Sequence, residues 1–551
     1  MELFISANLA PIMFGALVMF LLSGFPVAFS LAANGLLFGL VGMELGLLQP
    51  ALLQALPNRI LGIMANDTLL AIPFFTLMGL ILERSGMAED LLDTIGQLFG
   101  PVRGGVAYAV IFVGALLAAT TGVVAASVIS MGLISLPVML RYGYDKRLAC
   151  GVIAASGTLA QIIPPSLVLI VMADQLGRSV GAMYQAALIP GLLLTALYAG
   201  YVLALSVFKP GHVPALPPAA RNLRQPNGDS GARSLLALAL GAAGAGALFA
   251  RCYGAGHPAM AADALAVCGA AVGVAGALLL ALANRRWQWG LLSRLAERVV
   301  FVLVPPLALI FLVLGTIFIG VATPTEGGGL GAAGAMVLAI LGGRLSWPLL
   351  RQAMDATTRL SCFVLFILIG STVFALVFRG VNGDLWIEHL LGGLPGGATG
   401  FLVVVNLLFF VLAFFLDFFE LAFILVPLVG PVAEKLGIDL VWFGVLLGVN
   451  MQTSFMHPPF GYALFYLRSV APKEVKTGDI YRGAMPFVLI QIAMVALIIA
   501  FPRLVSVQKR VDMQEQLELH IAAPAGTPDA APDARDAEPP ALRFSTDSEK
   551  K

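Results

Sequence analysis

Charged residues are scarce in this chain. Asp, Glu, Lys and Arg make up only 11% of its 551 residues, against about 25% in ordinary soluble proteins. Apolar residues make up 59%, and the mean hydropathy is +0.93. Because so few charges cannot coat several water-facing domains, the composition excludes an ordinary soluble protein. It predicts an all-α polytopic membrane protein.

Cysteine is also rare, and basic and acidic residues occur in nearly equal numbers. The four cysteines are scattered without a short Cys-x-x-Cys spacing, so neither a disulfide framework nor a zinc site is expected. The 32 basic and 31 acidic residues leave a net charge of +1, which argues against a nucleic-acid partner. The N-terminus lacks a basic n-region and a cleavage site, so its first apolar run is expected to be a retained span.

Motifs of two large enzyme classes are absent. The sequence contains no His-Glu-x-x-His and no Gly-x-x-x-x-Gly-Lys-[Ser/Thr], which removes the zinc-metalloprotease and P-loop ATPase interpretations. We therefore expect that the chain is not an enzyme. Any transport should be driven by an ion gradient.

Apolar runs of about 20 residues, the length that spans a membrane, occur throughout the chain. In the first half they cover 8–24, 26–48, 66–83, 104–142, 148–172 and 183–208, and in the second half 298–321, 325–343, 360–380, 398–433, 440–467 and 483–502. The runs 104–142 and 398–433 are too long for one span and too short for two. Each is predicted to form a re-entrant helical hairpin.

The two halves are separated by a segment of different composition. Residues 209–234 are rich in Pro, Arg, Asn and Gly, which is typical of a linker. Ala/Gly-rich runs at 235–251 and 262–283 predict two additional membrane helices. The Pro- and acid-rich C-terminal segment, 504–551, is predicted to be a disordered tail. Basic clusters at Arg285 and Arg286 and at Lys146 and Arg147 should mark cytoplasmic loops.

An internal repeat relates the two halves. Pro164-Pro165 in the first half recurs as Pro458-Pro459 in the second, 294 positions later. In both halves one hairpin-like run lies directly upstream of the pair, and a tyrosine, Tyr184 or Tyr481, follows it. Repeats with matching features of this kind predict a duplicated architecture.

Each Pro-Pro pair should break a helix within the membrane. Proline donates no backbone hydrogen bond and frees the carbonyl one turn earlier, so the freed groups need a cation, a water or a neighbouring donor. Two broken helices at matching positions of two repeats indicate a midplane substrate and ion site in a secondary transporter. The residues predicted to bind or gate the substrate are Thr120, Ser156, Thr158, Asp417, Glu420, Asn450 and Gln452.

Two carboxylates and a histidine lie within this apolar background. Asp417 and Glu420 are three positions apart inside the run 398–433, where a charge costs at least about 2.5 kcal/mol. They are candidates for a hairpin tip, a cation site or a proton site, and alternatively Asp417 caps the second hairpin helix. His457 directly precedes the second Pro-Pro pair. It is a candidate proton site or hydrogen-bond donor, and equally a structural histidine.

Several of these stretches resemble one transporter family. Ser156 to Pro165, Ala322-Thr323-Pro324-Thr325-Glu326 and Asn450 to Phe465 resemble the large membrane subunit of the tripartite ATP-independent periplasmic (TRAP) transporters. The resemblance covers about residues 1–208 and 298–503. The two Ala/Gly-rich segments and the acidic tail fall outside it.

The resemblance implies an elevator-type ion transporter with two inverted repeats, each having scaffold helices and a transport part built from a re-entrant hairpin and a Pro-broken helix. A sodium gradient would drive uptake of an organic acid, such as a dicarboxylate or keto acid, across a bacterial inner membrane. A periplasmic substrate-binding protein and a small four-helix membrane subunit would be its partners. The implied division is 1–103 scaffold, 104–208 first transport repeat, 209–297 linker and inserted helices, 298–397 second scaffold, 398–503 second transport repeat and 504–551 tail.

The resemblance also implies two sodium sites, with Na⁺ as coupling ion and no other cofactor. Carried over by motif, they involve Thr121, Gly122, Ala160, Ile163 and Pro165 in the first repeat and Ser454, His457 and Phe460 in the second. Hydroxyl and carbonyl oxygens suit an alkali cation only, not a transition metal. This chain departs from the family where His457 replaces the usual Thr and where Ala160 and Ser454 replace a common Gly. The imidazole is therefore hypothesised to make transport pH-dependent.

Two other functions compete with this interpretation. A stand-alone carrier or antiporter of the same wider architecture would need no binding protein. An intramembrane hydrolase would use Asp417, Glu420 and His457, but the sequence offers no nucleophile paired with a base. The permease subunit is the leading hypothesis, and a purely structural membrane scaffold is disfavoured because paired helix breaks and buried carboxylates are costly without a ligand.

Overall fold

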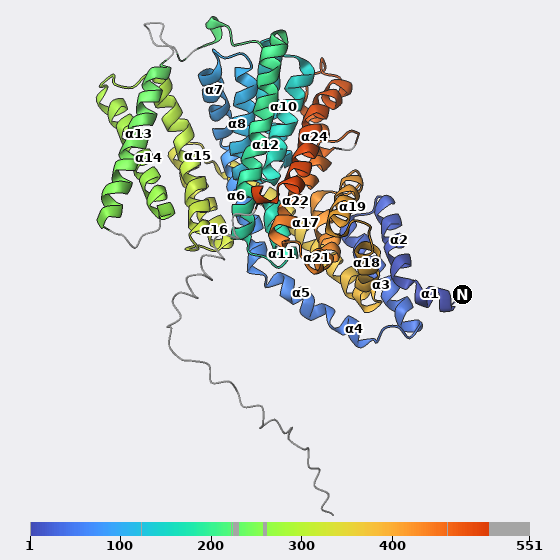
Figure 1. The fold of residues 1–551 in the computed structure, drawn as a ribbon. Helices are drawn as coiled ribbons and strands as arrows, with labels where there is room; N and C mark the ends of the chain where they lie inside the picture. Colours follow the sequence, from blue (N-terminus) through green and yellow to red (C-terminus); the bar gives the residue numbers. More distant parts are fainter. Residues whose placement is uncertain are drawn as a thin grey trace, which may run out of the picture. The chain divides into compact units, whose positions relative to one another are not determined.

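The computed structural model describes residues 2–122, 124–221, 223, 231–256, 262–459 and 461–505. Within these residues all regular structure is helical (Figure 1). Eight of the described helices are long and apolar enough to cross a membrane, or up to ten if two bent pairs each count as one span. The fold is thus the all-α polytopic class that the composition predicts. The expected acid-rich tail lies outside the described residues from position 506 onward.

The first half begins with the short helix α1 (Glu2–Ala7). Its helices after that are α2 (Leu9–Leu22), α3 (Val27–Glu44), α4 (Ala51–Gln54), α5 (Leu56–Met64), α6 (Asp67–Arg84), α7 (Met87–Phe99), α8 (Gly105–Thr121), α9 (Val124–Arg141), α10 (Lys146–Thr158), η1 (Leu159–Gln161), α11 (Leu167–Gln175) and α12 (Val180–Phe208). The predicted hairpin 104–142 is the helix pair α8 and α9, which contact each other. The predicted broken helix is α10, η1 and α11.

The second half has a similar but not identical order of elements. Its helices are α15 (Arg294–Phe318), α16 (Pro324–Leu341), α17 (Trp347–Gly380), α18 (Gly383–Gly392), α19 (Gly397–Leu412), α20 (Phe418–Ile424), α21 (Val426–Lys435), α22 (Leu440–Gln452), η4 (Thr453–Phe455), α23 (Tyr462–Val470) and α24 (Thr477–Ala500), followed by η5 (Pro502–Leu504). The run 398–433 forms three helices, because the chain is interrupted between α19 and α20 and again at Leu425.

Each half packs against the other through equivalent pairs of helices. Helix α3 packs on α17, and its counterpart α16 packs on α6. Helix α10 packs on α24 and α12 on α22, while α9 contacts α23 and α11 contacts α20. The neighbouring positions of α10, α12 and α24 are visible in Figure 1. Because helices of each half pack on helices of the other, neither half completes its own core alone.

One close helix contact shows why small residues are needed in this arrangement. Gly151 of α10 faces Gly483 of α24, and a Cβ on Gly151 would lie 2.1 Å from the Gly483 carbonyl oxygen. A Cβ on Gly483 would lie 2.0 Å from the Arg147 carbonyl oxygen. Such backbone contact is possible only without side chains, as at many membrane helix crossings. The two repeats are therefore joined where both helices carry glycine.

The segment between the halves contains η2 (Pro210–His212), η3 (Pro218–Ala220) and the helices α13 (Ala232–Gly256) and α14 (Ala262–Trp287). Helices α13 and α14 pack on each other and on α15 (Figure 1). The start and end of this two-helix insertion meet, because the Ser293 hydroxyl donates a hydrogen bond of 3.1 Å to the Gly231 carbonyl oxygen. The insertion thus leaves and rejoins the chain at one place.

Some helices are longer or more numerous than the hydropathy pattern predicts. Helix α17 begins at Trp347, capped by the Ser346 hydroxyl, whereas the apolar run starts near 360. Its first turns contain charged residues, which hydropathy excludes from a span although nothing there breaks a helix. The short or amphipathic helices α4, α5, α7 and α18 were not expected either. None of them contains an apolar run of membrane length.

Candidate functional site

The first helix break lies between α10 and α11. The 3-10 turn η1 follows Thr158, and a short non-helical stretch contains Pro164 and Pro165, joined by a cis peptide bond. The Ser166 hydroxyl then caps α11 by accepting from the Leu169 amide and donates to the Gln161 carbonyl oxygen. Tyr184 of α12 donates to the Ser166 carbonyl oxygen at 3.4 Å. Side chains thus bond several backbone groups that the break leaves without helical partners.

The second break has the same construction between α22 and α23. The 3-10 turn η4 follows Gln452, and Pro458 and Pro459 are joined by a cis peptide bond. Tyr481 of α24, the repeat equivalent of Tyr184, donates to the Pro459 carbonyl oxygen at 3.2 Å. The two breaks therefore share their 3-10 turn, their Pro-Pro pair and a supporting tyrosine.

The two broken helices meet at a buried hydrogen-bond network. The Gln452 amide nitrogen donates to the Thr158 hydroxyl oxygen at 3.2 Å, and these residues are separated by 294 positions, the spacing of the repeat. Gln491 of α24 donates to the same hydroxyl at 3.4 Å and to the Tyr198 hydroxyl of α12 at 2.9 Å. All four side chains are fully buried. The network joins equivalent positions of the two repeats in the protein interior.

The tip of the first helix pair lies against the first break. Gly122 ends α8 in the left-handed conformation, with φ of 58°, which favours glycine. A Cβ on Gly122 would lie 3.0 Å from the Leu167 Cγ atom at the start of α11. Thr120 and Thr121 are the last residues of α8, and their side chains lie outside the described part of the structure. Backbone proximity of this tip and the break is what a shared site requires.

The corresponding tip in the second half holds the two carboxylates. Asp417 caps α20 by accepting from the Glu420 amide at 3.0 Å, and the Glu420 carboxylate accepts from the Asp417 amide at 2.9 Å. This reciprocal pair is a capping box. Both residues are half-buried. The structure thus places them at the start of the second hairpin helix, where the capping interpretation put Asp417, with oxygen lone pairs left for other partners.

His457 connects this second tip to the second break. Its ring stacks on Phe414, with ring centroids 3.8 Å apart, and meets Phe410 edge-on at 5.2 Å. Only 3% of His457 is exposed, and neither ring nitrogen has a hydrogen-bond partner within the described structure. The carboxylates of Asp417 and Glu420 bond backbone amides and make no bond to this imidazole. The three residues are therefore not arranged as an acid–base pair around a nucleophile.

The remaining predicted site residues are buried near the breaks. The Ser156 hydroxyl donates to the Ile153 carbonyl oxygen, the Ser454 hydroxyl to the Met451 carbonyl oxygen, and the Asn450 amide to the backbone and side-chain oxygens of Asn406. Ala160, Ile163 and Pro165 lie in the first break and are buried. Phe460 lies outside the described residues. The described members all belong to the two breaks or to the helix turns that precede them.

Sequence reasoning included Gln452 but missed two other glutamines in this region, Gln161 and Gln491. The side-chain carbonyl oxygens of Gln161, Gln452 and Gln491 are buried without a hydrogen-bond partner in the described structure. Gln161 and Gln491 were not predicted as site residues, although polar residues in apolar runs are a signal for function. Neutral oxygen donors beside freed backbone carbonyls fit a hard alkali cation. At the second break the unpartnered atoms also include the two ring nitrogens of His457. Nitrogen suits an alkali cation less well than oxygen does.

Comparison with known proteins shows which family has this arrangement. The family described as "Tripartite ATP-independent periplasmic transporter, DctM component" matches residues 14–504. This chain belongs to that family. The match spans both halves of the chain and the residues between them, and it confirms the resemblance drawn from Ser156 to Pro165, Ala322 to Glu326 and Asn450 to Phe465.

Relatives of this TRAP permease have names that mention different substrates. The C4-dicarboxylate TRAP transporter large permease protein of Pseudomonas aeruginosa is 27% identical over 83% of this chain and 89% of its own length. The sialic acid TRAP transporter large permease protein of Vibrio cholerae is 25% identical over 88% and 94%. The ectoine TRAP transporter large permease protein of Halomonas elongata is 24% identical over 90% and 97%. The chain is similar to large permeases of several kinds.

Basic residues of the TRAP permease gather at one end of the helices. Arg298 pairs with Asp93, Arg344 with Asp90 and Arg147 with Asp479. Lys146 donates to the Glu474 carbonyl oxygen, and Arg84 to the Gln352 side chain. We call this end, where α6 and α16 finish and α10, α15, α17 and α24 begin, the basic face. The positive-inside rule predicts that such an end faces the cytoplasm.

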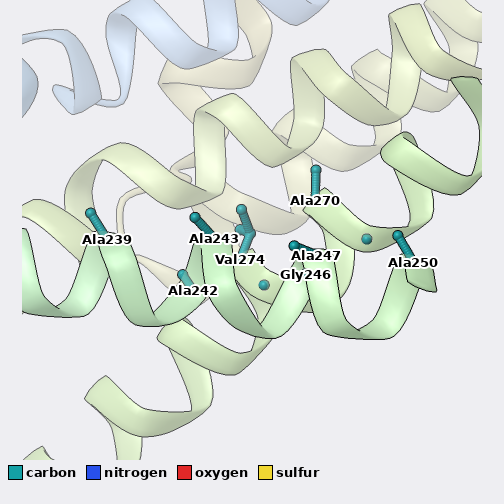
Figure 2. Close-up of a pocket in the computed structure, with 10 residues that line it drawn as sticks. Ala239, Ala242, Ala243, Gly246, Ala247, Ala250, Ala270 and Val274 are labelled. Atoms are coloured by element: carbon teal, nitrogen blue, oxygen red, sulfur yellow. The ribbon is translucent and has the colours of Figure 1, made fainter. Parts of the chain in front are cut away.

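Two apolar cavities lie along the inserted helices. One, of about 610 Å³, is lined by Ala, Gly and Val residues of α13 and α14, as Figure 2 shows. The other, of about 630 Å³, lies along α14 and α15. Their linings offer almost no polar groups, so neither has the convergent donors that fix a polar substrate. These cavities are lined only by α13, α14 and α15.

Proposed function

We propose that this TRAP permease is the large subunit of a sodium-coupled importer of organic acids in a bacterial inner membrane. It would work with a periplasmic substrate-binding protein and a small four-helix membrane subunit. The observation that carries the proposal is the pair of equivalent helix breaks, each contacted by a hairpin tip and joined through Thr158 and Gln452. Paired broken helices are the usual setting of substrate and ion sites in secondary transporters.

Sodium coupling is supported by the chemistry of the breaks. The first break offers backbone carbonyls around Ala160, Ile163 and Pro165, with the unpartnered Gln161 oxygen nearby. The second offers Ser454 and the unpartnered Gln452 oxygen. Neutral oxygens of this kind bind Na⁺ without requiring a counter-charge. A cation bound there would add the positive charge that a carboxylate substrate needs at the same depth.

An elevator movement is supported by the division of the helices into two groups that pack mainly among themselves. Helices α8 to α12 and α19 to α24 form one group around the breaks, while α3, α6, α16 and α17 pack on one another outside it. The proposed transport group would slide as a unit against this scaffold, carrying the substrate across. A polar network buried wholly inside the moving group, such as Thr158 with Gln452, Gln491 and Tyr198, would move without being broken.

The names of the relatives support a binding-protein-dependent permease over the stand-alone carrier. They are described as large permease proteins of TRAP transporters that handle C4-dicarboxylates, sialic acid or ectoine. Because these substrates differ in size and charge, the acid handled by this chain has to be found by experiment. Transport also fits the site better than catalysis, since the carboxylates cap a helix and do not bond His457.

The test is uptake by proteoliposomes that contain the full chain with its small membrane subunit. Succinate, pyruvate, 2-oxoglutarate and sialic acid are offered with the purified binding protein, under an inward sodium gradient or a matched potassium gradient. The proposal predicts uptake of one acid that requires both the sodium gradient and the binding protein. Uptake without the binding protein would favour the stand-alone carrier. Uptake driven equally by a proton gradient without sodium would contradict sodium coupling.

A further inference from the structure

A polar cavity lies at the end of the molecule opposite the basic face. Its volume is about 360 Å³, and its lining comes from α5, α11, α17 and α21 and from Asn66, the residue that caps the start of α6. Asn66 caps the start of α6 and Arg379 lies in the last turn of α17, whereas Arg84 at the end of α6 and Gln352 near the start of α17 bond each other on the basic face. The cavity therefore lies at the ends of α6 and α17 that are remote from the basic face.

Two arginines at the rim of this cavity have no acidic partner. Arg59 of α5 and Arg379 of α17 both line it, and neither forms an ion pair with a described residue. Elsewhere at this end the basic side chains are matched, since Arg178 pairs with Glu434 and Lys435 with Glu388. Two guanidinium groups left unpaired at one cavity create a local excess of positive charge.

The one carboxylate in the lining is already occupied by other donors. Asp174 accepts from the Asn66 amide at 2.7 Å and from the Gln175 amide at 2.9 Å. Because these neutral amides satisfy it, Asp174 leaves both guanidinium groups free of a direct partner. With two positive charges and one negative charge, the lining has a net charge of +1. Ser371 and Thr372 of α17 also line the cavity, and the Ser371 hydroxyl donates to the Phe423 carbonyl oxygen.

The size and chemistry of the cavity fit a small organic anion. Cavities that bind small molecules usually measure about 300–1,000 Å³, so 360 Å³ suits a compact acid. Guanidinium groups present a planar fork of N–H donors that binds a carboxylate through two parallel hydrogen bonds. Arginines that only reach toward the membrane surface would not need to converge on one polar cavity.

We propose that Arg59 and Arg379 form a carboxylate-binding site that receives the organic acid at the end opposite the basic face. This proposal rests on the proposed function for the source of the acid. The site lies between α5, Asn66 and α17 on one side and α11 and α21 on the other, and the Asn66–Asp174 bond connects the two sides. An acid bound there would contact both the scaffold and the transport group. It would therefore favour the conformation in which this cavity is formed.

The test measures the melting temperature of the full-length purified chain in neutral detergent at fixed pH and ionic strength. Succinate, pyruvate and 2-oxoglutarate are titrated, each beside its uncharged amide. At least one acid should raise the melting temperature of the wild type, while its amide should not. Arg59→Gln and Arg379→Gln should each raise the half-saturating concentration about tenfold or more, because each removes charged hydrogen bonds to the ligand.

Matched variants separate binding from general damage. Arg178→Gln removes an arginine of the same end that is outside the cavity and paired with Glu434, so it should leave the acid titration unchanged. Arg59→Lys and Arg379→Lys keep the charge but lose the fork, and should fall between wild type and the Gln variants. If no acid stabilises the wild type, or if the Arg59→Gln/Arg379→Gln double variant responds like the wild type, the proposal is wrong.

Two further experiments complete the test. One identifies whether the bound anion is an organic acid or a lipid headgroup, and the other shows whether the acid site and sodium coupling stand or fall together. In nanodiscs, stabilisation of the wild type by phosphatidylglycerol but by none of the acids would overturn the proposal in favour of a lipid headgroup. Sodium is titrated in the same experiments against potassium. Loss of the acid response in the double variant, with a sodium-selective shift retained, supports both proposals. An acid response in a wild type that shows no sodium selectivity would support the cavity and count against sodium coupling.

Discussion

At the scale of single residues, Asp417 combines a structural contact with a possible charge-dependent role, and substitution can separate the two. Asparagine is as good a helix cap as aspartate, whereas alanine is not. Asp417→Asn should keep the stability of the protein and abolish uptake, because the cap survives and the charge at the second hairpin tip does not. Asp417→Ala should also lose about 1 kcal/mol of stability. Uptake near the wild-type rate in Asp417→Asn would show that the carboxylate acts only as a cap.

Thr158 offers a second residue-scale test, because it accepts hydrogen bonds from two buried amides. Thr158→Val should destabilise the protein by about 1–3 kcal/mol, since it leaves the Gln452 amide nitrogen without its partner. The measurement is the denaturant midpoint in one detergent. Thr195→Val is the control, because the Thr195 hydroxyl bonds only a carbonyl of its own helix. The double variant Thr158→Val/Gln452→Leu should lose less than the sum of the single effects, and strict additivity would contradict direct coupling.

Residue-level prediction from the sequence worked where chemistry is tied to a motif. Pro164-Pro165 and Pro458-Pro459 both coincide with a helix break, as expected because proline lacks the donor that continues a helix. Pro305-Pro306, by contrast, lies inside the continuous helix α15, so a Pro-Pro pair alone does not dictate a break. The sequence also placed Thr158 and Gln452 at equivalent positions of the repeat, and the structure shows that they contact each other. The role of Gln491 and Tyr198 was not predictable, since nothing in the sequence tells which faces of α24 and α12 turn toward α10. The capping of α20 by Asp417 was foreseen as one of several alternatives.

At the scale of elements, the contact between α10 and α24 depends on glycine at both positions. Gly151→Ala should destabilise the protein by about 1–3 kcal/mol, because its Cβ would overlap the Gly483 carbonyl oxygen and force the helices apart. Gly478→Ala is the matched control in α24, where nothing lies within 4 Å of the added Cβ. It should be neutral or slightly stabilising, owing to better helix propensity. Equal melting temperatures for both variants would mean that the close approach does not hold the repeats together.

The two-helix insertion is predicted to be dispensable for folding. Joining Gly231 to Ser293 directly removes α13 and α14 and preserves the direction of the chain, because these residues already contact each other. The newly exposed face of α15 would meet lipid, which is as apolar as the helices removed. The melting temperature should fall by no more than about 2–4 °C, equivalent to about 1 kcal/mol. Loss of folded protein on size-exclusion chromatography would contradict this independence.

Hydropathy predicted long apolar helices well and other elements poorly. The helices α12, α15 and α24 lie close to their predicted runs, because a continuous apolar stretch has few alternatives in a membrane. Helix α5 is short and α7 is amphipathic, so neither could be recognised by a search for membrane-length runs. The charged first turns of α17 were excluded for the same reason. Packing against neighbouring helices, not hydrophobicity, specifies these elements.

At the scale of the whole molecule, the two repeats exchange packing partners, and this exchange brings both helix breaks together. Helix α3 packs on α17 and α16 on α6, while α10 packs on α24 and α12 on α22. The repeat itself is visible in the sequence from its Pro-Pro pairs. The exchange of partners is not, because a repeat pattern does not specify which half supplies each neighbour. The cavity at Arg59 and Arg379 is likewise a product of this assembly, since its lining comes from four helices of both halves, α5, α11, α17 and α21, together with Asn66.

Sodium binding is the property on which the account depends most, and it can be measured without knowing the transported acid. The melting temperature of the purified full-length chain is followed while sodium replaces potassium at constant ionic strength, for wild type, Asp417→Asn and His457→Thr. A ligand that binds only the folded state stabilises it with the logarithm of its concentration above the dissociation constant. The account predicts that sodium raises the melting temperature of the wild type more than potassium does. It also predicts that the sodium concentration giving half of this rise differs in His457→Thr. Identical curves for sodium and potassium in the wild type would contradict it.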